Sequence, residues 1–356
     1  MKTHGDTAAE GGGRRPALLV APDSFKGTFS AARVAQAIGR GAAAAGVEAV
    51  LCPVADGGEG TLDALVSARG GELRRASASD PLGRPLHAPW ALLDDGATAV
   101  LESAAASGLH HLGPRPTPAA ALAASTAGTG ELIVAARDAG ARRVLLGVGG
   151  SATTDGGRGA IEAIARAGGL RGVQLDVICD VDVPFERAPA VFAPQKGADA
   201  ATVALLEARL DALAATLPRD PRGVPMTGCA GGLSGGLWAA FGARLHPGAG
   251  FVLDAIGFDA QLARATAVAT GEGRLDEQTL AGKLIAVVAA RCRAARVPLH
   301  AVVGQCALPG ERVRELSLAS VSVAPTEAAL EAAGRALGER LTGVASAGDV
   351  LVRTFV

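Results

Sequence analysis

Runs of apolar residues alternate with alanine-rich stretches along most of this chain. Five runs are apolar at nearly every position, at 17–20, 47–54, 143–148, 173–179 and 299–303. A strand covered on both faces shows no polar alternation, so these runs predict strands of a parallel sheet. The alanine-rich stretches between them predict helices that cover the sheet. The pattern therefore favours an α/β fold.

Composition narrows the classes of partner. The 356 residues carry a formal net charge of −1 and only 3% are aromatic, so the chain offers neither a basic surface nor stacking platforms for nucleic acid. Every long apolar run is interrupted by Gly, Arg or Asp, and we expect no membrane span. The five cysteines form no C-x-x-C pair and lie mostly among apolar residues. They predict buried free thiols in a cytoplasmic protein.

Four loops that follow strand-like runs combine glycine with acidic residues. They are 21–31 (APDSFKGTFSA), 54–61 (VADGGEGT), 147–157 (GVGGSATTDGG) and 270–283 (TGEGRLDEQTLAGK). Ligands of α/β proteins bind at the carboxyl ends of strands, where such loops lie. Glycine lets a phosphate approach the backbone, and a divalent metal lets a carboxylate share the site. The loops predict a nucleotide with Mg²⁺, and ordinary turn chemistry is the alternative.

Lysine is rare in this chain, which uses arginine for most of its 34 basic residues. Beyond Lys2, the lysines are Lys26, Lys196 and Lys283, and each has a glycine neighbour. Lysine is a compact charge on a flexible stem, which suits a moving phosphoryl group better than the planar arginine fork. These three lysines are therefore candidate phosphate ligands, with ordinary surface lysines as the alternative.

Other motifs are weaker. The residues around Lys283 do not fit the P-loop pattern, and the histidines have no metal-binding spacing. No G-x-S-x-G elbow occurs. Residues 147–152 (GVGGSA) fit a loose dinucleotide-binding pattern with Asp176 downstream, so a dinucleotide site stays open as an alternative.

Several long motifs together resemble the glycerate 2-kinase family, in which bacterial enzymes phosphorylate glycerate with ATP. The segments are 21–31, 53–61, 102–109 (ESAAASGL), 128–133 (GTGELI), 149–157, 192–198 (FAPQKGA) and 270–283. The resemblance implies two α/β lobes, a Rossmann-like parallel-sheet domain and a second mixed α/β domain inserted in it, with the active site in the cleft between them. It also implies ATP and Mg²⁺ as cofactors, D-glycerate as substrate and 2-phosphoglycerate as product. A homodimer is an open expectation.

The resemblance also divides the chain. Residues 16–75 with about 260–356 would form the Rossmann-like domain, and about 76–259 the inserted domain. Residues 1–15 lack the apolar segment of a secretory signal and are expected to form a disordered arm.

The resemblance implies roles for individual residues. Four acidic residues are expected to bind Mg²⁺ or its waters: Asp56, Glu59, Asp155 and Asp276. Those expected to bind phosphate or substrate are Asp23, Ser24, Lys26, Gly149, Gly150, Ser151, Thr153, Thr154, Lys196, Arg274 and Lys283. Asp180, at a strand end, is the first candidate for the general base and Asp276 the second, with Lys26 as a catalytic cation. Helix capping is the alternative role for the acidic residues.

The chain departs from the family's pattern in four places. The connection between Gly169 and Val173 is short, and 181–189 (VDVPFERAP) replaces a glycine-bearing turn. Ala193 stands where the family favours glycine, and Leu284 begins a stretch where it favours proline. Another small hydroxy acid as substrate, or a catalytically weakened nucleotide- or acid-binding protein, therefore stays open.

Overall fold

The computed structural model describes residues 17–280, 284–343 and 352–354. Within them, six strands form the first sheet in the order β14-β13-β11-β9-β1-β2. All neighbours pair in parallel except β14, which is antiparallel to β13. The strands are β1 (Ala17–Pro22), β2 (Glu48–Leu51), β9 (Ala267–Gly271), β11 (Leu299–Val303), β13 (Ser320–Val323) and β14 (Val352–Thr354).

Helices cover both faces of this sheet, which explains why consecutive residues such as Leu18 and Leu19 are both buried. On one face α1 (Ala31–Ala44) packs against α15 (Glu327–Thr342). Their backbones touch at glycine, since a Cβ on Gly41 would lie 1.9 Å from the carbonyl oxygen of Glu331. Here small residues, rather than large apolar ones, set the helix spacing.

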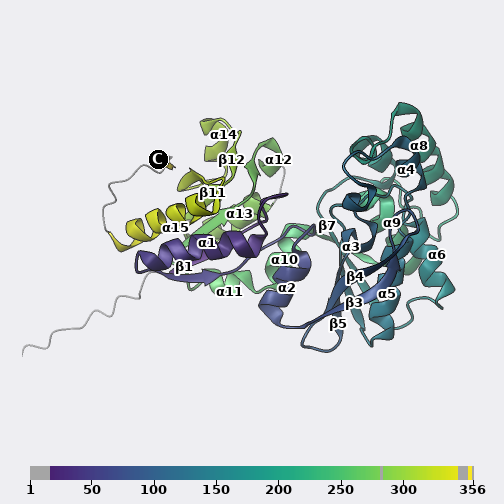
Figure 1. Ribbon diagram of the computed structural model, residues 1–356, viewed down its shortest axis with the longest axis horizontal. Helices are drawn as coiled ribbons and strands as arrows, with labels where there is room; N and C mark the ends of the chain where they lie inside the picture. Colours follow the sequence, from purple (N-terminus) through teal and green to yellow (C-terminus); the bar gives the residue numbers. More distant parts are fainter. Residues whose placement is uncertain (1–16, 281–283, 344–351, 355–356) are drawn as a thin grey trace, which may run out of the picture.

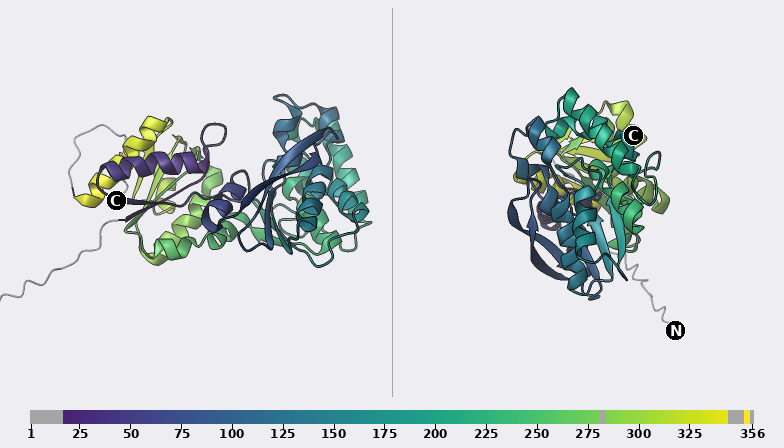
Figure 2. Two further views of the ribbon diagram at one scale, coloured as in Figure 1. Left: turned by 60° about the horizontal axis from the view of Figure 1, so that its bottom comes forward. Right: turned by 90° about the vertical axis from the view of Figure 1, so that its right-hand side faces the viewer.

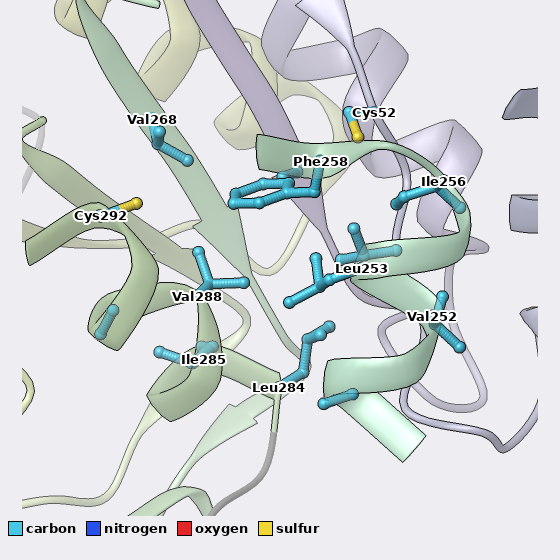
Figure 3. Packing of buried hydrophobic residues seen from close by; sticks show 14 of the residues in the cluster. Cys52, Val252, Leu253, Ile256, Phe258, Val268, Leu284, Ile285, Val288 and Cys292 are labelled. Atoms are coloured by element: carbon cyan, nitrogen blue, oxygen red, sulfur yellow. The ribbon is translucent and has the colours of Figure 1, made fainter. Parts of the chain in front are cut away.

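The other face is covered by α10 (Gly248–Ala255), α11 (Phe258–Leu262) and α13 (Leu284–Ala295). Figure 3 shows Leu253 and Phe258 packed toward Val288 in this core. Complete burial of one such side chain contributes roughly 1.5–3 kcal/mol. The prediction of a parallel sheet covered on both faces is confirmed.

A second sheet, of six strands within the described residues, has the order β3-β4-β5-β6-β7-β8. It is antiparallel from β3 to β5 and parallel from β5 to β8, as a mixed domain requires. The strands are β3 (Glu72–Ser79), β4 (Pro85–Leu92), β5 (Thr98–Glu102), β6 (Arg143–Gly147), β7 (Gln174–Cys179) and β8 (Arg244–Pro247).

Helices α5 (Ala127–Asp138), α6 (Arg158–Arg166) and α9 (Cys229–Phe241) pack on one face of this sheet, and the other face packs against residues of α2 (Thr61–Arg69) and α10. The second lobe also contains the long helix α8 (Ala200–Ala214). The chain enters this lobe after α2 and returns to the first lobe after β8. The two lobes lie side by side along the long axis of the molecule (Figures 1 and 2). The two-lobed α/β architecture is as expected.

One segment, Pro118–Asp138, is long and apolar enough to cross a membrane by length and composition alone. In the structure it consists of α4 (Pro118–Ala123) and α5, with residues 124–126 between them. Helix α5 packs on α6 and β3, and 50% of the most apolar part of this segment is buried. A core helix of a globular protein passes the same test.

Four of the five cysteines are buried, as the sequence predicted, and Cys306 is exposed.

Candidate active site

Two glycine-rich loops, residues 53–60 and 147–157, bring the lobes together. Residues 53–60 leave β2 and pack against the carboxyl ends of β6 and β7. A Cβ on Gly57 would lie 2.8 Å from the carbonyl oxygen of Ile178, and a Cβ on Gly149 would lie 2.5 Å from the Cα of Gly58. The amide of Gly149 donates to the carbonyl of Gly57 at 3.3 Å. These close approaches tolerate no side chain, and they hold Asp56 between the two sheets.

A cavity of about 420 Å³ opens at the carboxyl end of the first sheet. Because the central strands are parallel, the residues that follow β1, β9 and β11 meet at this edge. Its polar lining residues are Asp23, Ser24, Lys26, Thr28, Asp56, Glu272, Arg274, Asp276 and Gln305. We call this the first-lobe cavity. Four carboxylates and two cations face one small volume.

Asp23 is the most buried carboxylate of the first-lobe cavity, at 7% exposure. It directly follows β1, and its Oδ1 accepts a hydrogen bond of 2.6 Å from the amide of Ser24. Burial and then the neighbouring Asp56 carboxylate raise the pKa of Asp23 to about 7, against the opposing effects of the Ser24 amide and Lys26. Asp23 can therefore gain or lose a proton near neutral pH.

A second cavity, of about 730 Å³, opens at the carboxyl ends of β6 and β7. Its polar lining includes Ser151, Asp180, Asp182, Gln195 and Lys196, and Gly149 and Gly150 form part of its wall. We call this the second-lobe cavity. Lys26 and Asp56 line both cavities, so the two volumes meet at this pair.

Lys196 is held rigidly in the wall of the second-lobe cavity. It lies in a short 3₁₀ turn and is only 5% exposed. Its Nζ donates to Ser151 Oγ at 3.0 Å and to the carbonyl of Thr153 at 2.5 Å. Burial lowers the pKa of Lys196 to about 8, although the carboxylates of Asp155 and Asp180 oppose this shift. It is thus a fixed cation close to losing its charge.

Asp155 is the centre of a capping network. Its Oδ2 accepts hydrogen bonds from the amide of Thr126 at 2.9 Å, from Thr126 Oγ1 at 2.8 Å and from the amide of Gly159 at 3.1 Å. Its Oδ1 accepts from the amide of Gly157 at 3.1 Å. These donors include the N-terminal amides of α6, so Asp155 fits the helix-capping alternative.

Most of the expected site residues gather around the two cavities. Those in the first-lobe cavity are Asp23, Ser24, Lys26, Asp56, Arg274 and Asp276. The second-lobe cavity adds Gly149, Gly150, Ser151, Asp180 and Lys196. Because Lys26 and Asp56 line both cavities, these residues from the two lobes form one continuous site.

The remaining expected residues lie elsewhere. Among the described residues, neither cavity is lined by the exposed Glu59 or by Thr153, whose carbonyl binds Lys196. Thr154 and Asp155 line a different cavity, between α6 and α8. Lys283 falls outside the described residues. The assignments for all of these residues stay predictions.

Sequence reasoning overlooked several lining residues. Glu272 lies within the 270–283 loop and accepts a 2.5 Å hydrogen bond from Thr279 Oγ1. Gln305 closely follows β11, so inspection of every strand end would have found both. Asp182 also follows a strand end, that of β7, whereas Gln195 carried no comparable signal because a short turn brings it to the second-lobe cavity.

The two main departures from the family's pattern, at 169–173 and 181–189, lie at opposite ends of β7. The short connection at Gly169–Val173 precedes β7, so it lies at the amino end of that strand. Asp180 follows β7 at the opposite end. The shortening therefore does not border the cavities. Val181 and Asp182, which begin the second departure, do line the second-lobe cavity.

Comparison with known proteins agrees with this geometry. The model of the glycerate kinase family matches residues 18–168 and 165–348. Glycerate kinase of Bacillus subtilis is 39% identical over 88% of this chain and 92% of its own length. Glycerate 2-kinase of Escherichia coli is 36% identical over 81% of this chain and 84% of its own length. A crystal structure described as a 'putative glycerate kinase 2' of Salmonella typhimurium LT2 superposes with a TM-score of 0.76 and 31% identity, covering 92% of this chain and 99% of that one.

Proposed function

Because the chain belongs to the glycerate kinase family, we propose that it transfers the γ-phosphoryl group of ATP to the 2-hydroxyl of D-glycerate, giving 2-phosphoglycerate. The observation that carries this proposal is the junction of the two cavities at Lys26 and Asp56. Phosphoryl transfer needs two substrates aligned end to end, with cations and a metal at the transferred group. Two cavities with a shared lysine and carboxylate provide that arrangement.

Lys26 would neutralise the transferred phosphoryl group. Its side chain is exposed in a loop after β1 and lines both cavities, so the ammonium group can follow the phosphorus from donor to acceptor. Lys196 is buried and hydrogen-bonded, so it would hold a stationary group instead. The two lysines thus divide a mobile and a fixed role.

Magnesium fits the junction as a metal shared with the substrates. It binds one or two carboxylates together with phosphate oxygens and waters. In the described chain no group of three or more His, Cys, Asp or Glu side chains is arranged to hold a metal alone. Asp56 and Asp276, whose carboxylate oxygens suit a hard cation, would bind Mg²⁺ with the phosphates. When bound, the ion neutralises charge on the transferred group.

The general base depends on which cavity holds glycerate. Asp180 lines the second-lobe cavity, whereas Asp276 lines the first-lobe cavity. A base must reach the attacking hydroxyl, so a glycerate in the first-lobe cavity would use Asp276 and one in the second-lobe cavity would use Asp180.

The test is to incubate the purified protein with Mg-ATP and D-glycerate and to follow the products by phosphorus NMR. We expect the 2-phosphoglycerate signal to appear, and Lys26→Ala to slow it by about 10²–10³-fold. Lys26 is exposed, so this variant should fold normally. Production of 3-phosphoglycerate would contradict the regiochemistry. Absence of any product from glycerate would favour another small hydroxy acid, or a binding protein without turnover.

A further inference from the structure

The two cavities differ in the apolar surface that they present. In the first-lobe cavity the large apolar lining residues Phe25 and Leu284 are each only 2% exposed. In the second-lobe cavity Val191 is 42% exposed, and Phe192 and Leu109 are partly exposed. Exposed apolar side chains that line a concave site are typical of a binding surface for an apolar group.

The charges differ less. Apart from the shared pair, the second-lobe cavity has two carboxylates, Asp180 and Asp182, and one cation, Lys196. Apart from the shared pair, the first-lobe cavity has three carboxylates, Asp23, Glu272 and Asp276, and one cation, Arg274. Its acidic lining suits a small polyhydroxy acid, because carboxylates accept hydrogen bonds from hydroxyl groups and a guanidinium binds a carboxylate in a planar fork.

The wall of the second-lobe cavity suits a polyphosphate. Gly149 and Gly150 place bare backbone in one part of this wall, and Ser151 lies beside Lys196, which donates to its hydroxyl. Glycine-rich backbone with a fixed cation is a common setting for phosphate groups. This cavity is also the larger, at about 730 Å³ against about 420 Å³.

We propose that the nucleotide binds in the second-lobe cavity, with its base against Phe192, Val191 and Leu109, and that glycerate binds in the first-lobe cavity with its carboxylate on Arg274. The inference rests on the proposed kinase function. It has one chemical consequence, which is that Asp276 rather than Asp180 lies beside the attacking hydroxyl as the base, so that Asp56 rather than Asp276 holds Mg²⁺. The phosphoryl group then crosses from Lys196 toward Arg274 past Lys26 and Asp56.

The proposed nucleotide site is tested by calorimetric titration of the full chain with Mg-ADP, which requires no turnover. Phe192→Ala should raise the dissociation constant about tenfold, since loss of base stacking costs ~1–3 kcal/mol. Inorganic tripolyphosphate should bind both proteins equally, because it has no base. An unchanged affinity for Mg-ADP would overturn the assignment.

A second variant avoids loss of core packing, because Phe192 also packs against a small buried cluster. Val191→Glu places a charge on an exposed side chain and should weaken Mg-ADP binding at least tenfold. Leu205→Glu is its matched control, since Leu205 is 54% exposed on α8 and belongs to the described residues that line neither cavity. Equal affinity of the two Glu variants would overturn the assignment.

The glycerate half is tested with Arg274→Met, whose side chain is 62% exposed in the native protein. The KM for D-glycerate should rise more than tenfold, while the dissociation constant for Mg-ADP stays within twofold. The reverse pattern would place the nucleotide in the first-lobe cavity. If glycerate is not phosphorylated at all, the kinase proposal fails, whereas the Mg-ADP titrations still decide where the nucleotide binds.

Discussion

Two loops carry the same Asp-Gly-Gly sequence and use it in opposite ways. Residues 56–58 and 155–157 each follow a strand and precede a helix, α2 or α6. Both aspartates accept a hydrogen bond from the amide of the second glycine, at 3.2 Å from Gly58 and 3.1 Å from Gly157. The two loops thus share their sequence and this hydrogen bond, although Gly157 is left-handed (φ +79°) and Gly58 is not.

The difference lies in what caps the following helix. Asp155 accepts from the amide of Gly159 in α6, and it is also tied to Thr126. In α2 the N-terminal amides of Gly60 and Leu62 both donate instead to Glu102, each at 2.9 Å. Because Glu102 supplies that cap, Asp56 can face the junction of the two cavities. The role of an Asp-Gly-Gly loop is therefore decided by a distant acceptor.

The largest expected effect comes from Asp56→Asn. Asparagine still accepts the Gly58 hydrogen bond but removes the charge at the cavity junction. We expect kcat/KM for phosphorylation to fall by about 10²–10³-fold, which is typical of losing one electrostatic element of a transition-state site. The free energy of unfolding in urea should change by less than about 1 kcal/mol, within the usual range for changes outside the packed core. Near-native activity would remove Asp56 from the proposed mechanism.

The same substitution in the other loop should mainly affect stability. Asp155→Asn removes a charged acceptor and turns an amide group toward the donors from Thr126 and Gly159. Hydrogen bonds to charged groups contribute ~1.5–3 kcal/mol each, so we expect the free energy of unfolding to fall by about 2–3 kcal/mol. Urea denaturation of both Asn variants compares the loops directly. An Asp155 variant as stable as the Asp56 variant would show that the capping network contributes little.

This pair shows what the sequence can and cannot indicate. Apolar runs predicted β1, β2, β6, β7 and β11. The expected burial on both faces holds for four of them, but it is wrong for the edge strand β2, whose Val50 and Leu51 are exposed. The polar strand β3 gave no such signal. It is the edge strand of the second sheet, pairs with β4 in antiparallel fashion and is packed against α5. The lining carboxylates could be predicted as a set, because they follow strand ends. Asp56 and Asp155 could not be told apart, because the cap on α2 comes from Glu102 in a different strand.

Gly231, which packs against Thr153 and Thr154 just before the 155–157 loop, provides a test of how that part of the chain is held in place. Gly231 is left-handed (φ +66°), and a Cβ there would lie 2.0 Å from the carbonyl oxygen of Thr153, which accepts from Lys196. Gly172 is also left-handed (φ +77°), but no described heavy atom lies within 4 Å of its added Cβ.

In both Gly231→Ala and Gly172→Ala, the left-handed backbone should lower the free energy of unfolding by ~1–2 kcal/mol. Only Gly231→Ala also collides with the loop, which should cost about 1–2 kcal/mol more in the free energy of unfolding. Thermal or urea unfolding of the pair measures this difference. Equal destabilisation would mean that the loop moves aside freely and that Gly231 does not position the Thr153 carbonyl.

The smallest effect is a pH dependence that also distinguishes the two aspartates. Burial lowers the pKa of Lys196 to about 8, and the carboxylates of Asp155 and Asp180 oppose that shift. The charged form predominates below this pKa and is lost above it. If the ammonium binds phosphate, kcat/KM for ATP should be halved near pH 8 and fall by about tenfold for each further pH unit. Direct product detection by phosphorus NMR avoids the pH limits of coupling enzymes.

Asp155→Asn removes one of the two carboxylates that favour the charged form, so the pKa of Lys196 should fall and the decline should begin at lower pH. Asp56 is not among the groups that shift this lysine, so Asp56→Asn should lower the whole profile without moving its midpoint. A midpoint that moves equally in both variants would mean that some other group controls the alkaline limb. Opposite behaviour of the two Asn variants would show that the second loop acts on the site through Lys196, while the first loop acts on it directly.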